Sequence, residues 1–441
     1  MQKIFTRTPK LLAVSAVITA SMVLTGCAAE TATDGAASAP AANDAPLTIL
    51  SQWGASDAEG LVLAETIAAF ELETGRTVEL TVVAGEGSDA KRTFEATVLA
   101  GSEPDLIFTN MYSSTVNWVD DGAAVAVDQY LTAWGLDSVI QPSALDVWRG
   151  SDGAIRGFPY SGLQWPVWYN TNLLEQAGVA AVPKTTDELI AAVKKLSAAN
   201  IQPFAIGGND WSGTKLFMQM VQNYLDDDAS KELLTNGGYC ANPDAMKGVD
   251  LVIDLVNQDV FLEDSQGLSY DQMVASYTTG QAAIMYTGQW AFAAVPEEIV
   301  SVTEFGGFPI SSDSVWSKPT AYNSQNGVGI SISQNGVKNI AAVEEFVKFM
   351  FQKSTVSNFA VNANVIPVVI PTGVDATGAD TLFVQSVTAL PEIVSYIPMP
   401  DDYVPGAVIN ALNGAVSLAF TKGNDRLTVC SALDAVYNSA K

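Results

Sequence analysis

The distribution of apolar and polar residues divides the chain into three parts before any motif is considered. Residues 11–24 form a largely apolar run of 14 positions that follows three basic residues. A helix that crosses a bilayer needs about 20 residues, so this run indicates a secretory signal rather than a permanent span. Residues 28–46 contain no large apolar side chain and cannot form a core. We therefore expect a signal over residues 1–26, a flexible tether over 27–46 and a folded body from Leu47.

The folded body opens with alternating strand and helix patterns. Apolar and β-branched residues favour one strand over 47–53 and another over 77–83. Between them, the spacing of apolar residues predicts a helix that ends near Gly75. Its buried face should carry Leu63, Ile67 and Phe70. A strand, a helix and a strand with short connections predict a right-handed βαβ unit on a parallel sheet, followed by a third strand over 105–109. These patterns indicate an α/β protein.

Length and composition limit the possible functions. The chain has 441 residues, more than one ordinary core requires, so we expect two or more domains. The formal net charge is −27, and a surface this acidic would repel a phosphate backbone, which argues against nucleic-acid binding. No histidine occurs in the sequence. This excludes catalysis by serine–histidine or cysteine–histidine pairs and metal sites with imidazole ligands. We expect neither a metal nor a cofactor.

The three cysteines have separate interpretations. Leu24-Thr25-Gly26-Cys27 has the form of a bacterial lipobox, so Cys27 is the expected site of lipidation and the first residue of the mature protein. An ordinary cleaved signal with a chance cysteine is the alternative. Cys240 and Cys430 then remain, and outside the cell they could form one disulfide or stay as two buried thiols.

Six short motifs follow one another over about 220 residues. They are FELETGRTV from Phe70, AGSEPDL from Ala100, DGAIRGFP from Asp152, WYNTNLLEQAG from Trp168, PKTTDEL from Pro183 and GQAAIMYTGQW from Gly280. Together they resemble the motifs of the extracellular solute-binding proteins of ABC importers, family 1. Arg156 and Thr186 depart from this pattern, because they stand where the family usually has an aromatic residue and a tryptophan.

The resemblance implies a two-lobed α/β fold of the periplasmic-binding-protein type, class II, in which helices flank mixed sheets and a ligand cleft lies between the lobes. Several crossings of the chain would make both lobes discontinuous. The expected N-terminal lobe comprises residues 47–159 and 327–361, and the expected C-terminal lobe comprises 160–326 and 362–441. The crossings are expected at 157–160, 327–333 and 361–367.

The resemblance also suggests a carbohydrate ligand, which presents an apolar face of C–H groups and a rim of hydroxyls. Aromatic rings, amides and carboxylates at strand ends and in loops suit these two surfaces. The candidate contacts are Trp53, Glu86, Asn110, Trp165, Asp210, Trp211, Gln289, Trp290 and Asn326. The family places a ligand-facing aromatic residue at the position of Trp290. Core packing is the alternative for each tryptophan, and a solvated charge or a helix cap is the alternative for Glu86 and Asp210.

The expected function is that of an extracellular binding protein and not of an enzyme. We expect a monomer, held at the outer face of the cell membrane by its lipid, that closes around a sugar or oligosaccharide and delivers it to the permease subunits of an ABC transporter. A receptor for a cationic solute such as a polyamine is the first alternative, because carboxylates and tryptophan faces bind ammonium groups. A glycoside hydrolase that pairs Glu86 with Asp210 is a remote alternative, since no hydrolase motif is present.

Overall fold

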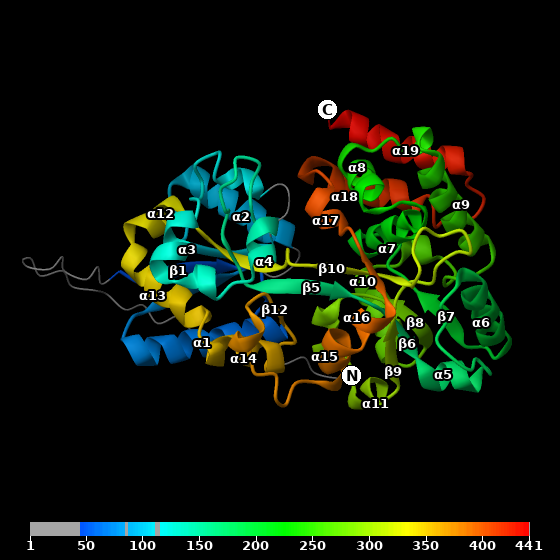
Figure 1. The fold of residues 1–441 in the computed structure, drawn as a ribbon, viewed down its shortest axis with the longest axis horizontal. Coiled ribbons are helices and arrows are strands. Elements are labelled where there is room, and N and C mark those ends of the chain that lie inside the picture. The colour runs from blue at the N-terminus through cyan, green and yellow to red at the C-terminus, as the bar shows by residue number, and fades with distance from the viewer. Residues whose placement is uncertain (1–44, 84–86, 111–114, 441) are drawn as a thin grey trace, which may run out of the picture. The chain divides into compact units, whose positions relative to one another are not determined.

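The structure is a computed structural model that describes residues 45–83, 87–110 and 115–440 (Figure 1). The expected signal, the expected lipidation site Cys27 and the candidate ligand contact Glu86 lie outside these ranges. Within them, the strands form three β-sheets, and the two largest hydrophobic cores lie against the first and the third sheet.

The first sheet has the strand order β2-β1-β3-β11-β4. Its strands are β1 (Leu47–Ser51), β2 (Val78–Val82), β3 (Leu106–Asn110), β4 (Phe158–Pro159) and β11 (Val328–Ile332). β1 pairs in parallel with β2 and β3, and α1 (Ala58–Thr74) connects β1 to β2, which confirms the predicted βαβ unit. Gly75 ends α1 with a φ of 73°, a left-handed conformation that glycine adopts without strain. α2 (Gly87–Ala100) leads to β3.

The first core combines early and late parts of the chain. Phe70 of α1 contacts the rings of Phe346 and Phe349 in α13 (Ile340–Met350), at centroid distances of 5.0 and 5.5 Å. α14 (Lys353–Asn362) follows, and residues as far as Val369 belong to the same core. This core therefore extends beyond residue 361, the boundary that the sequence suggested for the N-terminal lobe.

β11 pairs with β3 along its whole length and with β4 at Gly329 and Ile330, so it is an ordinary strand of the first sheet. The crossing expected over 327–333 is therefore confined to residues 325–327, between β10 and β11. Gly327 is required there, because a β-carbon at this position would lie 2.5 Å from the carbonyl oxygen of Ser161.

The second sheet has the order β12-β5-β10-β13 and carries the chain between the other two sheets. Its strands are β5 (Ser161–Trp165), β10 (Thr320–Ser324), β12 (Ile366–Pro367) and β13 (Ser395–Ile397). β5 and β10 are antiparallel and lie side by side (Figure 1). Their register places Trp165 opposite Tyr322, so the end of β5 is fixed beside the middle of β10.

The third sheet has the order β7-β8-β6-β9. Its strands are β6 (Val167–Asn170), β7 (Gln202–Ala205), β8 (Ala282–Tyr286) and β9 (Thr303–Gly306). The capping box predicted at the start of α6 (Thr186–Ala198) is present, since Thr185 and Glu188 exchange hydrogen bonds. The second core includes residues from α6, α7 (Trp211–Val221), α9 (Pro243–Asn257), α18 (Gly406–Ser417) and α19 (Arg426–Ser439).

Shorter helices complete the described part of the chain. They are α3 (Asp128–Trp134), α4 (Pro142–Val147), α5 (Thr171–Gln176), α8 (Asp227–Asn236), α10 (Tyr270–Thr278), α11 (Glu297–Val300), α12 (Gln334–Lys338), α15 (Thr381–Thr388), α16 (Leu390–Ile393) and α17 (Pro400–Tyr403). Two cores on separate sheets, each flanked by helices, give the two-lobed α/β architecture that the sequence predicted.

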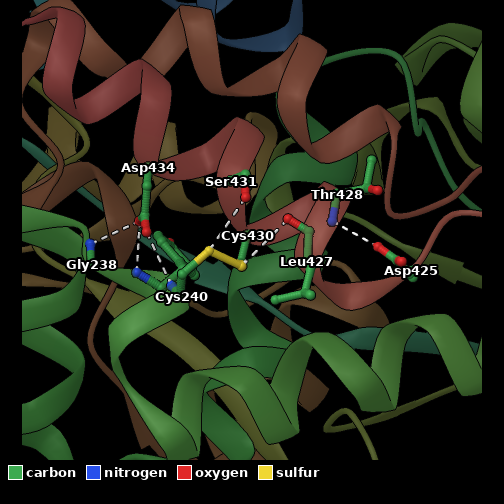
Figure 2. The surroundings of a disulfide bond; sticks show 9 residues. Gly238, Cys240, Asp425, Leu427, Thr428, Cys430, Ser431 and Asp434 are labelled. Atoms are coloured by element: carbon green, nitrogen blue, oxygen red, sulfur yellow. Dashed lines mark hydrogen bonds between the residues drawn. A yellow bond between two sulfur atoms is a disulfide. The ribbon is translucent and has the colours of Figure 1, made fainter.

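A disulfide links Cys240 in the short 3₁₀ turn Tyr239–Ala241 to Cys430 in α19 (Figure 2). The sequence had left this bond and two buried thiols as alternatives. Asp434, one helical turn beyond Cys430, accepts hydrogen bonds from the backbone N–H groups of Gly238, Tyr239 and Cys240 at 2.9, 2.7 and 3.0 Å. The bond and the carboxylate therefore attach the same turn to the same helix.

A candidate ligand-binding site formed by aromatic residues

Three of the candidate tryptophans lie together although they come from distant parts of the sequence. Trp165 ends β5, Trp211 begins α7, and Trp290 lies in the 3₁₀ helix Gln289–Ala294 after β8. The ring centroid of Trp165 is 5.5 Å from that of Trp211 and 4.8 Å from that of Trp290, and the Trp211 and Trp290 rings are 5.9 Å apart. The end of β5, the start of α7 and the 3₁₀ helix after β8 thus each contribute one ring to the same cluster.

Tyr270, which the sequence analysis did not select, is the fourth member of this aromatic cluster. Its ring centroid is 4.9 Å from that of Trp211, at an interplanar angle of 30°. Its hydroxyl oxygen accepts a hydrogen bond of 2.7 Å from Nε1 of Trp290. The capping box Ser269–Gln272 fixes Tyr270 as the first residue of α10. This box is the sequence signal that could have identified Tyr270, because it marks a helix start that carries an aromatic residue.

The four rings differ in their exposure. Trp165 is only 2% exposed and stacks on Tyr286 at 5.6 Å, so it forms the floor of the cluster. Trp211, Tyr270 and Trp290 are partly exposed and remain accessible to a ligand. The buried Nε1 of Trp165 and Oε1 of Gln164 have no hydrogen-bond partner among the described residues. The cluster therefore combines accessible aromatic rings with one buried donor, Nε1 of Trp165, that has no partner among the described residues.

Asp210 borders the cluster, and its carboxylate bonds within the protein. Oδ1 accepts hydrogen bonds from the backbone N–H and the hydroxyl of Ser212, at 2.9 and 2.7 Å, and so caps α7. Oδ2 accepts one from the backbone N–H of Tyr270 at 2.5 Å. Asp210 is therefore a helix cap, which was the alternative to a ligand contact, and it also binds the start of a second helix.

The two candidate amides Gln289 and Asn326 make hydrogen bonds within the protein. Gln289 is 5% exposed, and its Oε1 accepts from the backbone N–H of Gln164 at 3.0 Å, so it connects the turn that carries Trp290 to β5. Nδ2 of Asn326 donates to Asp402 at 2.9 Å, and its buried Oδ1 has no partner among the described residues. Asn326 lies in the short connection between β10 and β11.

The remaining candidates are not in the cluster. Trp53 is buried in the first core, where its ring contacts Phe108, Tyr160 and Phe359 at 5.8, 6.2 and 5.3 Å, as the packing alternative stated. Oδ1 of Asn110 accepts from Nε2 of Gln52 at 2.9 Å, which joins the ends of β1 and β3.

Two carboxyl groups near these elements have raised pKa values. Glu59, in the first turn of α1, is partly buried, and burial raises its pKa to about 7. Its carboxyl group forms no ion pair among the described residues, and a hydrogen bond from its own backbone N–H opposes the rise. Burial raises the pKa of Tyr270 to about 12, and the charge of Glu59 adds a smaller contribution. Burial, assisted by the adjacent Asp401, raises the pKa of Asp402 to about 6, against hydrogen bonds from Asn326 and Ser324. Asp401 itself forms a buried ion pair with Lys215 of α7.

The described residues contain neither a metal-binding cluster nor a membrane-spanning helix. No group of three or more histidine, cysteine, aspartate or glutamate residues could bind a metal ion there. No helix within the described ranges has the length and apolar character required to cross a membrane.

The sequence matches the family described as bacterial extracellular solute-binding protein over residues 54–356, which is more than half of the chain. All four members of the aromatic cluster lie in the matched region. The chain therefore belongs to this family of bacterial solute-binding proteins, which confirms the resemblance of its motifs.

Individual relatives agree with this assignment. The structure is similar to that of a probable secreted solute-binding lipoprotein from Streptomyces coelicolor, with a TM-score of 0.78 and 34% identity over 89% of this chain and 98% of that protein. A probable sugar-binding periplasmic protein of Rhizobium meliloti (strain 1021) is 26% identical over 243 residues, 54% of this chain and 57% of the relative. A multiple sugar-binding protein of Streptococcus mutans is 24% identical over 195 residues, 42% and 44% of the two chains. The chain thus spans about half the length of these two sequence relatives.

Proposed function

We propose that this protein is a carbohydrate receptor, attached through lipid at Cys27 to the outer face of the cell membrane, that delivers its ligand to the permease subunits of an ABC transporter. The observation that carries the proposal is the aromatic cluster, in which three partly exposed rings surround a buried one. The names of the Rhizobium and Streptococcus relatives, both sugar-binding proteins, support the same ligand class.

The cluster suits a sugar for two physical reasons. Tryptophan and tyrosine rings cover the apolar C–H face of a pyranose, and the unpaired Nε1 of Trp165 matches a hydroxyl group on its rim. Binding needs no reaction. The carboxylate of Asp210, one half of the hydrolase pair considered above, is already used by Ser212 and Tyr270. In this proposal the two lobes close around the ligand, and the first lobe extends past the expected boundary at residue 361 as far as Val369, which belongs to its core.

One observation favours the second candidate, a receptor for a cationic solute. Glu59 is a partly buried carboxyl group with no cation among its described neighbours, and its charge reaches Tyr270. An ammonium group bound between Glu59 and the ring of Tyr270 would be stabilised by both.

Thermal unfolding of the full-length chain with maltotriose, raffinose, N,N′-diacetylchitobiose and spermidine separates these functions. A ligand at one hundred times its Kd stabilises the native state by about 2.7 kcal/mol, which gives a clear rise in the midpoint. We expect such a rise with at least one of the sugars. A rise with spermidine alone would replace the carbohydrate by a cation, and no rise with any probe would refute the proposal for these ligand classes.

Trp290→Ala is the decisive variant for the site, and Trp316→Ala is its matched control. Both tryptophans are partly exposed and pack against the second core, but Trp316 lies outside the cluster and donates to the carbonyl of Gln222. Loss of a stacking ring should weaken sugar binding at least about tenfold in Trp290→Ala. An equal loss in both variants would show that the cluster is not the binding site.

A further inference from the structure

Tyr270 is fixed at both ends by bonds within the protein. Its backbone N–H donates to Oδ2 of Asp210 at 2.5 Å. Its hydroxyl oxygen accepts from Nε1 of Trp290 at 2.7 Å and from the hydroxyl of Thr287 at 3.4 Å. The ring between these two ends lies 4.9 Å from Trp211. These bonds fix the position of the ring and remove the rotamer freedom that a partly exposed aromatic side chain otherwise keeps.

Asp210 connects the starts of two helices. Oδ1 caps α7, whose first residue is Trp211, and Oδ2 binds the first residue of α10, Tyr270. One carboxylate thereby sets the distance between two neighbouring members of the cluster. An aspartate is suited to this task because both of its oxygens accept at the same time, which the amide of asparagine cannot do.

The hydroxyl of Tyr270 can still donate one hydrogen bond. A phenol has one proton to donate, and its oxygen already accepts two hydrogen bonds. No acceptor for that proton is present among the described residues. The hydroxyl can therefore offer a donor to a bound molecule without giving up a bond inside the protein.

We propose that Tyr270 is a ligand-binding residue that donates a hydrogen bond to an oxygen atom of the ligand, and that Asp210 is the positioning residue that fixes it against Trp211. The part that concerns the ligand rests on the proposed function. The assignment also narrows the chemistry at this position, because a hydroxyl, ring or glycosidic oxygen accepts a hydrogen bond and an ammonium group does not.

Tyr270→Phe tests the hydrogen bond, and Tyr277→Phe is the matched control on the same helix. The hydroxyl of Tyr277 is buried and pairs with Oγ1 of Thr303 at 2.9 Å, away from the cluster. Titration calorimetry of the full-length chain with maltotriose, raffinose and N,N′-diacetylchitobiose should show affinity about five- to tenfold weaker in Tyr270→Phe and unchanged in Tyr277→Phe. Equal affinities in Tyr270→Phe and the unchanged chain would overturn the role of Tyr270 while the proposed function stands.

The role of Asp210 has a readout that needs no ligand. The near-ultraviolet circular dichroism of the unliganded protein reports how the rings of Trp211 and Tyr270 are fixed. We expect Asp210→Ala to lose part of this signal and to bind the sugar about tenfold more weakly, and Asp210→Asn to recover part of both, since the amide keeps one acceptor. A lower unfolding midpoint with unchanged spectrum and affinity would reduce Asp210 to a helix cap and overturn its positioning role.

The two proposals fail in different ways. If none of the sugars binds the unchanged chain, the proposed function and the ligand contact of Tyr270 are both refuted, and the spectra of the Asp210 variants still decide the positioning role. If a sugar binds and Tyr277→Phe weakens it as much as Tyr270→Phe does, only the contact of Tyr270 is refuted.

Discussion

Replacing Cys240 and Cys430 by alanine should destabilise the second core strongly. The bond joins residues separated by 190 positions, and cross-linking a loop of that length removes entropy from the unfolded chain worth about 5 kcal/mol at 25 °C. The native segment stays attached without it, because Asp434 still binds the turn through Gly238, Tyr239 and Cys240. The loss should therefore arise mainly in the unfolded state.

Urea unfolding with hydrogen-exchange detection measures this effect where it is expected. Slowly exchanging amides of α19 and α9 should report a free energy of opening that is lower by several kcal/mol in the double variant, and amides of β1 and β3 in the first core should change little. Asp434→Asn is the comparison for native contacts alone, since it weakens the carboxylate bonds and leaves the cross-link, with an expected cost of about 1–3 kcal/mol.

Two outcomes would refute the reasoning. A loss below about 1 kcal/mol in the double cysteine variant would show that the loop-entropy argument does not apply to this chain. An equal loss in both cores would show that the bond stabilises the whole body rather than the core that contains Cys430.

Two further predictions concern buried charges. Glu59 has an ordinary pKa of 4.5 that burial raises to about 7, so the folded chain retains the proton that the unfolded chain has lost, and stability falls by about 3 kcal/mol as the pH rises through that window. Glu59→Gln should remove this fall, with little effect at pH 4 and stabilisation at pH 8 in urea titrations, and an unchanged pH slope would contradict the assignment. Lys215→Met leaves the buried carboxylate of Asp401 without its cation and should lower the free energy of unfolding by about 3–5 kcal/mol. A midpoint in thermal unfolding equal to that of the unchanged chain would contradict it.

The fold was largely predictable because its signals are local. The βαβ unit, the glycine that ends α1 and the capping box of α6 each depend on residues that are close in sequence, and the structure contains all of them. The boundaries of the hydrophobic cores were harder to predict from the sequence. Val369 belongs to the first core through contacts with residues far away in sequence, which no local pattern encodes.

The aromatic cluster was predictable in part for the same reason. Trp165, Trp211 and Trp290 stand at the ends of strands or the starts of helices, and the structure brings them together. Trp53 has the same local setting but is covered by Phe359, which comes from α14 more than 300 residues later. Whether an aromatic side chain at a strand end is accessible depends on what packs over it, and that information is not local.

Tyr270 is the converse case, a member of the cluster that the sequence did not identify. Its local pattern is a capped helix start, and its importance arises only because Asp210 and Trp290 reach it from other elements. A polar network of this kind depends on tertiary contacts, so its members could be recognised individually but not as a unit.

The first sheet places a constraint on the order of events during synthesis. Its early strand β3 needs β11 as a neighbour, and α1 needs α13 to cover Phe70, yet β11 and α13 lie at residues 328–332 and 340–350. The N-terminal third of the chain therefore has to wait, with apolar faces uncovered, until about three quarters of the protein has been made. Long-range contacts of this kind slow folding and expose the intermediate to aggregation. A nascent chain with this topology is a natural client for chaperones, and a truncation before residue 350 should accumulate as aggregate rather than as a folded first lobe.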